Sequence, residues 1–193
     1  MKNLKIIVAE DETLVALSII SQLKELGYQI VGDAVDGVEA IELCEKLHPD
    51  LVVMDINMPR LNGVQAAKTI RERYRIPVVV VTGYSDDQLI SEAAEAGVFN
   101  YLIKPVTKQN LAPAIEVALK NHADYCQALD EASQLRQMLE ERKVIERAKG
   151  ILMESGNLSE VEAMRKLQKL SNDKNEKLSA IARKIIEAKN LLA

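Results

Sequence analysis

Residues 51–63, LVVMDINMPRLNG, begin with an apolar run that is followed directly by an acid, Asp55. The apolar run IIVA, residues 6–9, is followed in the same way by Glu10 and Asp11. Short β-branched runs separated by amphipathic helical stretches predict an α/β fold, whose parallel sheet carries functional residues at the carboxyl ends of its strands. Carboxylates crowded there repel one another, and a hard cation such as Mg²⁺ relieves that repulsion. The pattern predicts a metal and phosphoryl site, with ordinary solvated acids as the alternative.

Two further strand ends carry groups that a phosphoryl site needs. The run VVVVT, residues 78–82, ends in the hydroxyl of Thr82, and YLIKP, residues 101–105, ends in Lys104 and Pro105. A bound phosphoryl group needs a cation and hydrogen-bond donors in addition to its metal. Lys104 and Thr82 can supply both from the same sheet edge.

These strand-end residues, in this order and spacing, resemble the receiver domain of two-component response regulators. The residues that carry the resemblance are Glu10, Asp11, Asp55, Thr82, Lys104 and Pro105. The stretch DINMPRLNG, residues 55–63, resembles the loop that follows the phosphorylated aspartate in that family. The resemblance covers residues 4 to about 121 and implies a flavodoxin-like fold, a doubly wound sheet of five parallel strands. It also implies a sensor histidine kinase as the partner that phosphorylates Asp55.

The resemblance assigns roles to individual residues. Asp55 would be the nucleophile, Lys104 would neutralise charge on the transferring oxygens, and Thr82 and Tyr101 would form the switch that responds to phosphorylation. Mg²⁺ would be the cofactor. Its ligands would be Glu10 (partly through water), Asp11, Asp55 and the backbone carbonyl of Asn57.

Apolar periodicity predicts alternating strands and helices over this part of the chain. The strands are expected near residues 5–9, 30–34, 51–54, 78–82 and 100–103. The helices are expected over residues 14–26, 37–47, 64–74, 86–96 and 108–121. Gly27 and Gly97 are expected to end the first and fourth helices.

The composition of the 193 residues suits one α/β core with a smaller appendage. No apolar run approaches the roughly 18 residues of a membrane span, and the first residues lack the pattern of a signal peptide, so a cytoplasmic protein without membrane contact is expected. Cys44, Cys126, His48 and His122 lack the spacing of disulfide, zinc or redox sites. Both cysteines are interpreted as packing residues.

The end of the chain differs in charge from its beginning. Residues 1–133 contain twelve Lys and Arg against twenty Asp and Glu, whereas residues 134–193 contain thirteen against nine. The first part therefore carries a net charge of −8 and the second a net charge of +4. We predict a receiver domain over residues 1–121, a coiled-coil-like linker over 122–145 and an output domain over 146–193 whose first helix begins at about residue 135.

The linker region lacks helix breakers, which predicts that one helix continues out of the receiver. Its apolar seam includes Tyr125, Ala128, Ala132, Leu135, Met138 and Leu139. Arg142 interrupts the seam, so the heptad pattern favours a weak or switchable homodimer that forms on phosphorylation. A solvated monomeric helix is the alternative.

Two short helices are expected beyond Gly156. Ser159 and Glu162 have the spacing of a capping box, and Asn175 is expected to cap the start of the last helix. A three-helix bundle of this size suits binding better than catalysis.

The stretch ERAKGILMESGNLSEVEAM, residues 146–164, resembles the ANTAR domain, a three-helix RNA-binding module of transcription antitermination regulators. The resemblance covers about residues 135–191. Four residues depart from the family pattern, namely Met164, where an aromatic is usual, Gln168, Ser171 and Asn172. The resemblance places RNA contacts at Lys149 and Arg165 first, and then at Arg147 and Lys169. From charge alone, these cations could instead pair with nearby glutamates on solvated helix faces.

We therefore expect a response regulator, not an enzyme, in which phosphorylation of Asp55 controls an ANTAR domain that binds a structured RNA hairpin and causes antitermination. One alternative is a phosphorylation-dependent dimerising protein-interaction regulator that binds no nucleic acid. An aspartyl-phosphate phosphatase is disfavoured because Asn57 offers no second acid at the site. DNA binding is disfavoured because the last helices show no helix-turn-helix signature.

Overall fold

The computed structural model describes residues 4–83 and 100–191. The chain divides into two compact units, Met1–Gln127 (the first unit) and Ala128–Ala193 (the second unit). The helix predicted over residues 86–96, and the stop predicted at Gly97, lie outside the described residues.

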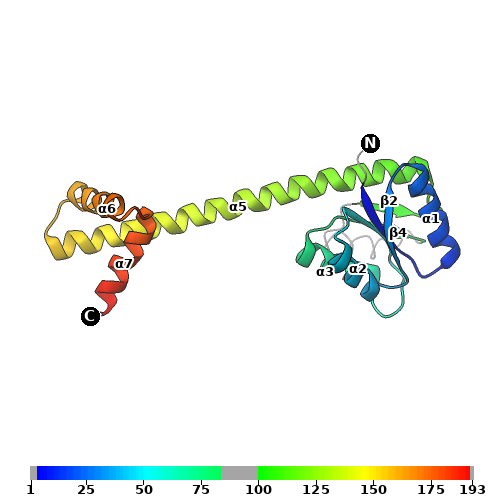
Figure 1. Cartoon of the computed structure of the whole chain (residues 1–193), viewed down its shortest axis with the longest axis horizontal. Coiled ribbons are helices and arrows are strands. Elements are labelled where there is room, and N and C mark those ends of the chain that lie inside the picture. Colours follow the sequence, from blue (N-terminus) through cyan, green and yellow to red (C-terminus); the bar gives the residue numbers. More distant parts are fainter. Residues whose placement is uncertain (1–3, 84–99, 192–193) are drawn as a thin grey trace. The chain divides into compact units, whose positions relative to one another are not determined.

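The first unit is built on a five-stranded parallel sheet, as predicted (Figure 1). Its strands, in the spatial order β2-β1-β3-β4-β5, are β1 (Lys5–Ala9), β2 (Gln29–Ala34), β3 (Leu51–Asp55), β4 (Val78–Thr82) and β5 (Asn100–Ile103). The described helices that accompany them are α1 (Thr13–Glu25), α2 (Gly37–Leu47), α3 (Gly63–Tyr74) and the beginning of α5 (Lys108–Gly156). The order reverses between β1 and β3, and the crevice at such a reversal is where doubly wound sheets place their sites.

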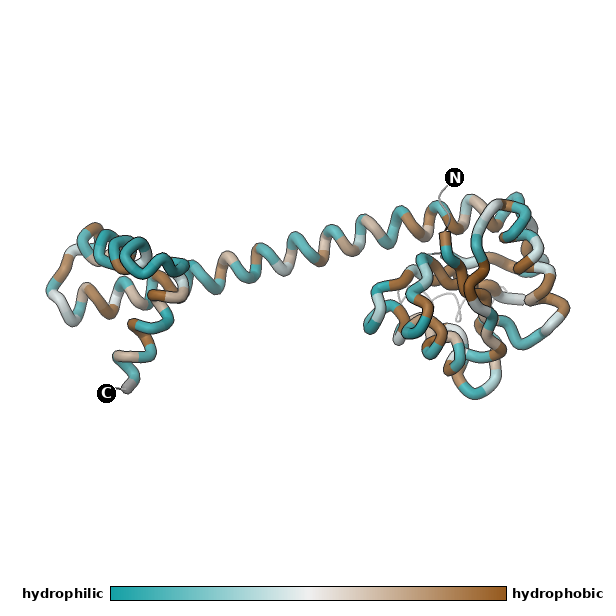
Figure 2. The backbone as a smooth tube through the Cα atoms, in the orientation of Figure 1, coloured by the Kyte–Doolittle hydropathy of each residue, from teal (hydrophilic) through white to brown (hydrophobic). Residues whose placement is uncertain are grey.

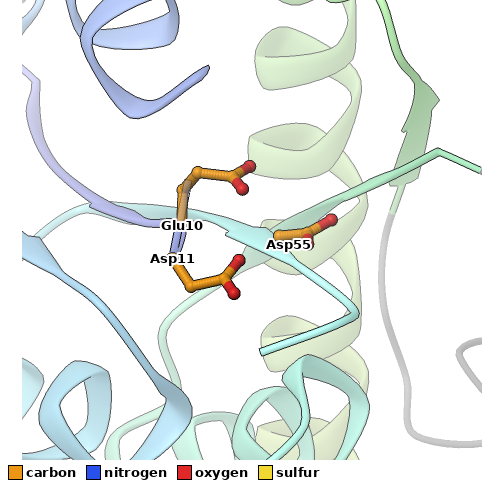
Figure 3. Close-up of side chains that lie close together, drawn as sticks. All are labelled: Glu10, Asp11 and Asp55. Atoms are coloured by element: carbon orange, nitrogen blue, oxygen red, sulfur yellow. The ribbon is translucent and has the colours of Figure 1, made fainter. Parts of the chain in front are cut away.

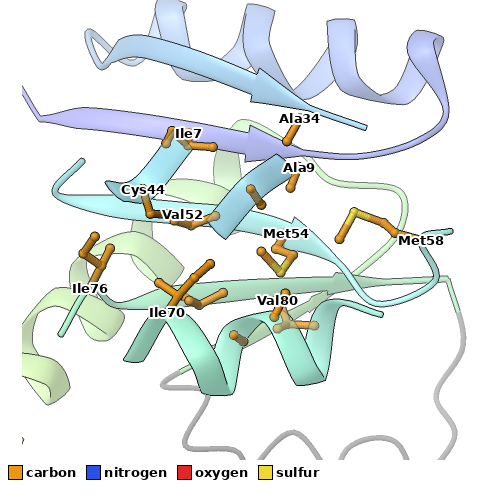
Figure 4. Close-up of a cluster of buried hydrophobic side chains, with 14 of the residues drawn as sticks. Ile7, Ala9, Ala34, Cys44, Val52, Met54, Met58, Ile70, Ile76 and Val80 are labelled. Atoms are coloured by element: carbon orange, nitrogen blue, oxygen red, sulfur yellow. The ribbon is translucent and has the colours of Figure 1, made fainter. Parts of the chain in front are cut away.

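The alternation of side chains along the strands divides the core between the two faces of the sheet. On one face, Ile7, Val52 and Val80 pack against α2 and α3 (Figure 4). On the other face, Val8 and Val53 pack against residues of α1 and α5. Burial on both faces explains why β3 and β4 are continuous apolar runs, which appear as the hydrophobic centre of the unit in Figure 2.

Turn chemistry in the first unit also agrees with the sequence. Gly27 follows α1 with a φ of 85°, a left-handed conformation that side chains disfavour, and so it ends the helix as predicted. Asp36 begins α2 by accepting hydrogen bonds from the N–H groups of Val38 (2.9 Å) and Glu39 (3.0 Å).

Helix α5 continues from the first unit into the second, which confirms the prediction of one uninterrupted helix ending at Gly156. The large side chains of its apolar seam, those of Tyr125, Leu135, Met138 and Leu139, are exposed, and so is that of Leu129. None of the described helices, this long one included, has a stretch apolar enough to cross a membrane.

The second unit consists of the end of α5 with α6 (Glu160–Lys174) and α7 (Leu178–Leu191). The three helices bury a small core of Ala148, Leu167, Ile181 and Ala182. The predicted capping box is confirmed, because Ser159 and Glu162 exchange side-chain and backbone hydrogen bonds.

The expected role of Asn175 is wrong. This residue adopts a left-handed conformation with a φ of 51° and ends α6, instead of capping the start of α7. Asparagine tolerates that conformation better than most residues, so the same residue type serves at either kind of helix end.

Candidate functional site

Three carboxylates converge at the carboxyl ends of β1 and β3. Glu10 and Asp11 follow β1, Asp55 is the last residue of β3, and oxygen atoms of all three lie within 4.8 Å of one another (Figure 3). Glu10 and Asp55 are 2% and 5% exposed, whereas Asp11 is exposed to solvent. The structure thus brings together the three acids that we predicted from the sequence to form a metal and phosphoryl site.

One ammonium group lies among these acids. The Nζ of Lys104 is 2.8 Å from Oε2 of Glu10 and 3.4 Å from Oδ1 of Asp55. Lys104 comes directly after β5, and its backbone N–H donates to the Thr82 carbonyl oxygen at 2.8 Å. A cis peptide bond joins Lys104 to Pro105.

The other predicted site residues flank this cluster on neighbouring strands. Thr82 is buried at the end of β4, whose residue Val81 pairs in register with Asp55. Tyr101 lies on β5 and is 43% exposed. Asn57 lies two residues beyond Asp55 with an exposed side chain.

Burial and charge act against each other at this cluster. Burial raises the pKa of Asp55 more strongly than Lys104 lowers it, and burial together with the Asp55 charge likewise raises the pKa of Glu10. Although burial lowers the pKa of Lys104, the two acids outweigh this effect and raise it. Three carboxylates sharing one ammonium leave an excess of negative charge on oxygen atoms, the donor set that Mg²⁺ prefers.

The loop after Asp55 is held close to the end of β3. The N–H of Gly63 donates to the carbonyl oxygen of Ile56 at 2.9 Å. A Cβ atom at Gly63 would lie 2.9 Å from the carbonyl carbon of Asp55 and closer still to its oxygen. Only glycine allows this approach, so Gly63 fixes the backbone that carries the site.

A second link holds the same loop, and sequence reasoning missed it. Nε of Arg60 donates to Oδ2 of Asp36 at 2.6 Å, and a second guanidinium nitrogen contacts the same oxygen. The N–H of Gly37 donates to the carbonyl oxygen of Leu61 at 3.2 Å. The link therefore ties the loop to the start of α2. Asp36 stands directly before the amphipathic stretch of α2, and this position could have identified it as a helix cap. Nothing in the sequence identifies Arg60 as its partner.

The Asp36–Arg60 pair predicts a pH-dependent contribution to stability. Burial raises the pKa of Asp36, but hydrogen bonds from Glu39, Arg60 and Val38 outweigh it and lower that pKa below its usual value. Stability from a carboxylate with a lowered pKa is present above the pKa of the unfolded chain and lost as the pH falls through the folded value. Because Arg60 is 59% exposed, water screens the pair, and we expect Arg60→Met to cost about 1 kcal/mol at pH 7.

Denaturant unfolding of the Arg60→Met variant at pH 7 and at a pH below the lowered pKa of Asp36 measures this effect. The deficit should shrink at the lower pH, where Asp36 becomes protonated in the folded protein. Lys68→Met removes an exposed cation for which the described residues supply no ion-pair partner, and it should change stability little at either pH. An Arg60→Met deficit that does not change with pH would contradict the role of the Asp36 charge.

Comparison with known proteins agrees with this geometry. The family model of the response regulator receiver domain matches residues 6–116. The chain belongs to the response regulator family. A second family model, that of the ANTAR domain, matches residues 133–186.

Some relatives match nearly the whole chain, and others match a part of it about the length of the receiver domain. The transcriptional regulatory protein PdtaR of Mycobacterium tuberculosis is 38% identical over 183 residues, which are 95% of this chain and 89% of PdtaR. The chemotaxis protein CheY-3 of Vibrio cholerae is 34% identical over 118 residues, which are 60% of this chain and 91% of CheY-3.

Solved structures resemble the first unit. The signal receiver domain of a modulated diguanylate cyclase from Desulfovibrio desulfuricans superposes with a TM-score of 0.59 at 30% identity, covering 62% of this chain and 96% of that one. A LuxR-family two-component response regulator from Aurantimonas superposes with a TM-score of 0.58 at 27% identity, covering 68% and 99%.

The four residues predicted to contact RNA lie on two helices of the ANTAR domain, α5 and α6. Lys149 is 12% exposed, and its Nζ lies 2.6 Å from Glu146 and 2.7 Å from Glu160, so it joins α5 to α6. Arg165 and Lys169 are exposed one turn apart on α6. Arg147 is exposed on α5, beside a cleft that α5 forms with α7.

Proposed function

We propose that a histidine kinase phosphorylates this response regulator on Asp55 and that its ANTAR domain then binds a structured leader RNA, which suppresses transcription termination. The two domains are regulatory rather than catalytic. The observation that carries the proposal is the cluster of the buried acids Asp55 and Glu10 with Lys104, in a chain that also holds an ANTAR domain. We place this regulator in the cytoplasm.

In the proposed phosphorylation, Asp55 attacks phosphorus with a carboxylate oxygen while the bond from phosphorus to the donor breaks. Mg²⁺, held by Glu10, Asp11, Asp55 and the Asn57 carbonyl, would neutralise charge on the phosphoryl oxygens. Lys104 lies close enough to Asp55 to move from its carboxylate to the phosphoryl group. Burial of the nucleophile excludes water and strengthens these electrostatic interactions.

The proposed switch depends on Thr82 and Tyr101. The Thr82 hydroxyl would donate a hydrogen bond to the new phosphoryl group, and Tyr101, now 43% exposed, would turn inward behind it. These changes alter the outer surface at β4 and β5. We propose that the altered surface and the exposed seam of α5 favour a homodimer.

A surface beside the site suits the kinase partner. Leu14, Ile19 and Val106 help line a cavity of about 480 Å³ that reaches Lys104 and Pro105. Leu14 is 83% exposed. An apolar surface next to the phosphate acceptor supports docking of the protein that delivers the phosphoryl group.

Asp11→Ala tests the metal site. We expect the Mg²⁺ concentration for half-maximal phosphorylation by acetyl phosphate to rise about tenfold, since a site with few protein ligands loses one of them. Asp33→Ala is the matched control, because Asp33 is an exposed acid on the adjacent strand β2. Equal Mg²⁺ dependence in the two variants would count against metal binding at Asp11.

RNA binding tests the output function. The full chain, with and without beryllofluoride and Mg²⁺ as a phosphoryl mimic, is titrated with a pool of RNA hairpins, and tighter binding is expected with the mimic. Sedimentation of the same samples should show a larger dimer fraction. A dimer that binds no hairpin more tightly than it binds unstructured RNA would favour the alternative, a regulator that acts through protein contacts alone.

A further inference from the structure

A cleft of about 400 Å³ lies between α5 and α7 within the second unit. Val144 of α5 and Ile186 of α7 line it and also pack against the small core, so the cleft has an apolar floor. Arg147 and Arg183 line it from opposite helices. We call this feature the α5/α7 cleft.

The two arginines of the α5/α7 cleft differ from half of the eight lysines of the unit, which form ion pairs with glutamates. Four lysines form ion pairs with glutamates, and these lysines are Lys143, Lys149, Lys184 and Lys189. For Arg147 and Arg183, the part of the chain that the structure describes supplies no ion-pair partner. Two guanidinium groups that form no ion pair within the described residues, beside an apolar floor, attract a ligand that combines an anion with a flat apolar face.

The acids of the α5/α7 cleft narrow the choice of ligand. Glu140 is paired with Lys143 at 2.8 Å, but Glu187 forms no ion pair within the described residues. A carboxylate repels a bare phosphate, yet it accepts hydrogen bonds from the amino group of a base. The cleft therefore suits a nucleotide whose base is unpaired better than it suits the phosphate backbone of a duplex.

We propose that the α5/α7 cleft binds one unpaired nucleotide of an RNA loop, an inference that rests on the proposed RNA binding. One guanidinium stacks on the base above Val144 and Ile186, and the other binds the phosphate. Glu187 accepts a hydrogen bond from the exocyclic amino group of adenine, cytosine or guanine. Arginine stacking and recognition of unpaired bases are the usual means by which proteins read RNA loops.

The first test compares charge-removing variants of the full chain in the presence of Mg²⁺ and beryllofluoride. The probe is an RNA hairpin with a fixed stem and a loop of random sequence. Arg147→Gln and Arg183→Gln should each weaken binding about tenfold, because each removes a charge-assisted contact. Lys174→Gln, at the end of α6, should weaken it less than about threefold.

The second test uses Glu187→Met. Electrostatic attraction of phosphate and hydrogen bonding to a base predict opposite changes in the RNA affinity of this variant. Removing a negative charge strengthens binding if the cleft only attracts phosphate. Under our proposal, the variant binds the random-loop hairpin about tenfold more weakly, and it binds a hairpin with an all-uridine loop no more weakly, because uracil lacks an amino group. Circular dichroism of each variant establishes that the bundle is retained.

The outcomes separate the cleft from the proposed function. If both arginine variants bind the hairpin as tightly as the wild type and Arg165→Gln binds it more weakly, the α5/α7 cleft is not the RNA site. The RNA then binds on α6. Tighter binding of both hairpins by Glu187→Met overturns the role of the base. Wild-type protein that binds neither hairpin overturns the cleft and the proposed RNA binding together.

Discussion

Asp55→Asn should abolish phosphorylation by acetyl phosphate, with no label detectable above background. The amide keeps the shape of the carboxylate but lacks its nucleophilic oxygen, so the chemistry is lost while packing is preserved. The fold should persist, because the neutral side chain removes a buried charge whose pKa burial raises. Lys104 would then pair with Glu10 alone, at its present 2.8 Å.

Labelling with radioactive acetyl phosphate, followed by peptide mapping, measures this effect. Asp33→Asn is the matched control, because it makes the same change at an exposed position on β2 and should label as the wild type does. Undiminished labelling of Asp55→Asn at another residue would show that Asp55 is not the acceptor.

The sequence was sufficient for the receiver fold because its signals are local. The apolar runs of β3 and β4 are buried on both faces, and each ends at a polar residue at the same edge of the sheet. Parallel pairing in register then brings Asp55 next to the end of β4, close to Thr82. Glu10, Asp11 and Asp55 converge because β1 and β3 are parallel neighbours and because the acids stand where these strands end.

Contacts between distant segments could not be predicted in the same way. The Arg60–Asp36 pair joins residues 24 positions apart, and the choice of Asp36 over another acid depends on how the loop turns at Arg60, which has a φ of 60°. Lys149 meets Glu160 across a helix junction, a partner 11 residues away that helical spacing does not identify. Arg183 and Arg147 line the same cleft only because α7 packs beside α5. Charge patterns identify cations, but tertiary packing decides which of them are neutralised.

Gly63→Ala should destabilise the first unit by about 3 kcal/mol, because the added methyl group meets the backbone of Asp55 and Ile56 instead of a movable side chain. Relief of this overlap requires movement of the loop or of the strand end that carries Asp55. We therefore expect slower phosphorylation as well as lower stability.

The thiol of Cys44 reports the opening of this unit. Cys44 is fully buried in the first-unit core, and burial raises its pKa to about 12, so a thiol reagent reaches it only after local or global unfolding. A loss of about 3 kcal/mol should accelerate labelling of Cys44 about a hundredfold. Peptide mapping distinguishes this label from one on Cys126, which is partly exposed.

Gly150→Ala is the same substitution at a position with open space around it, inside helix α5. Alanine favours the helix there by about 0.5 to 1 kcal/mol, so the second unit should gain stability while Cys44 labels at the wild-type rate. If Cys44 of Gly63→Ala is labelled at the wild-type rate, the loop accommodates the methyl group by moving, without disturbing the core. In that case, Gly63 would not be what holds Asp55 in place.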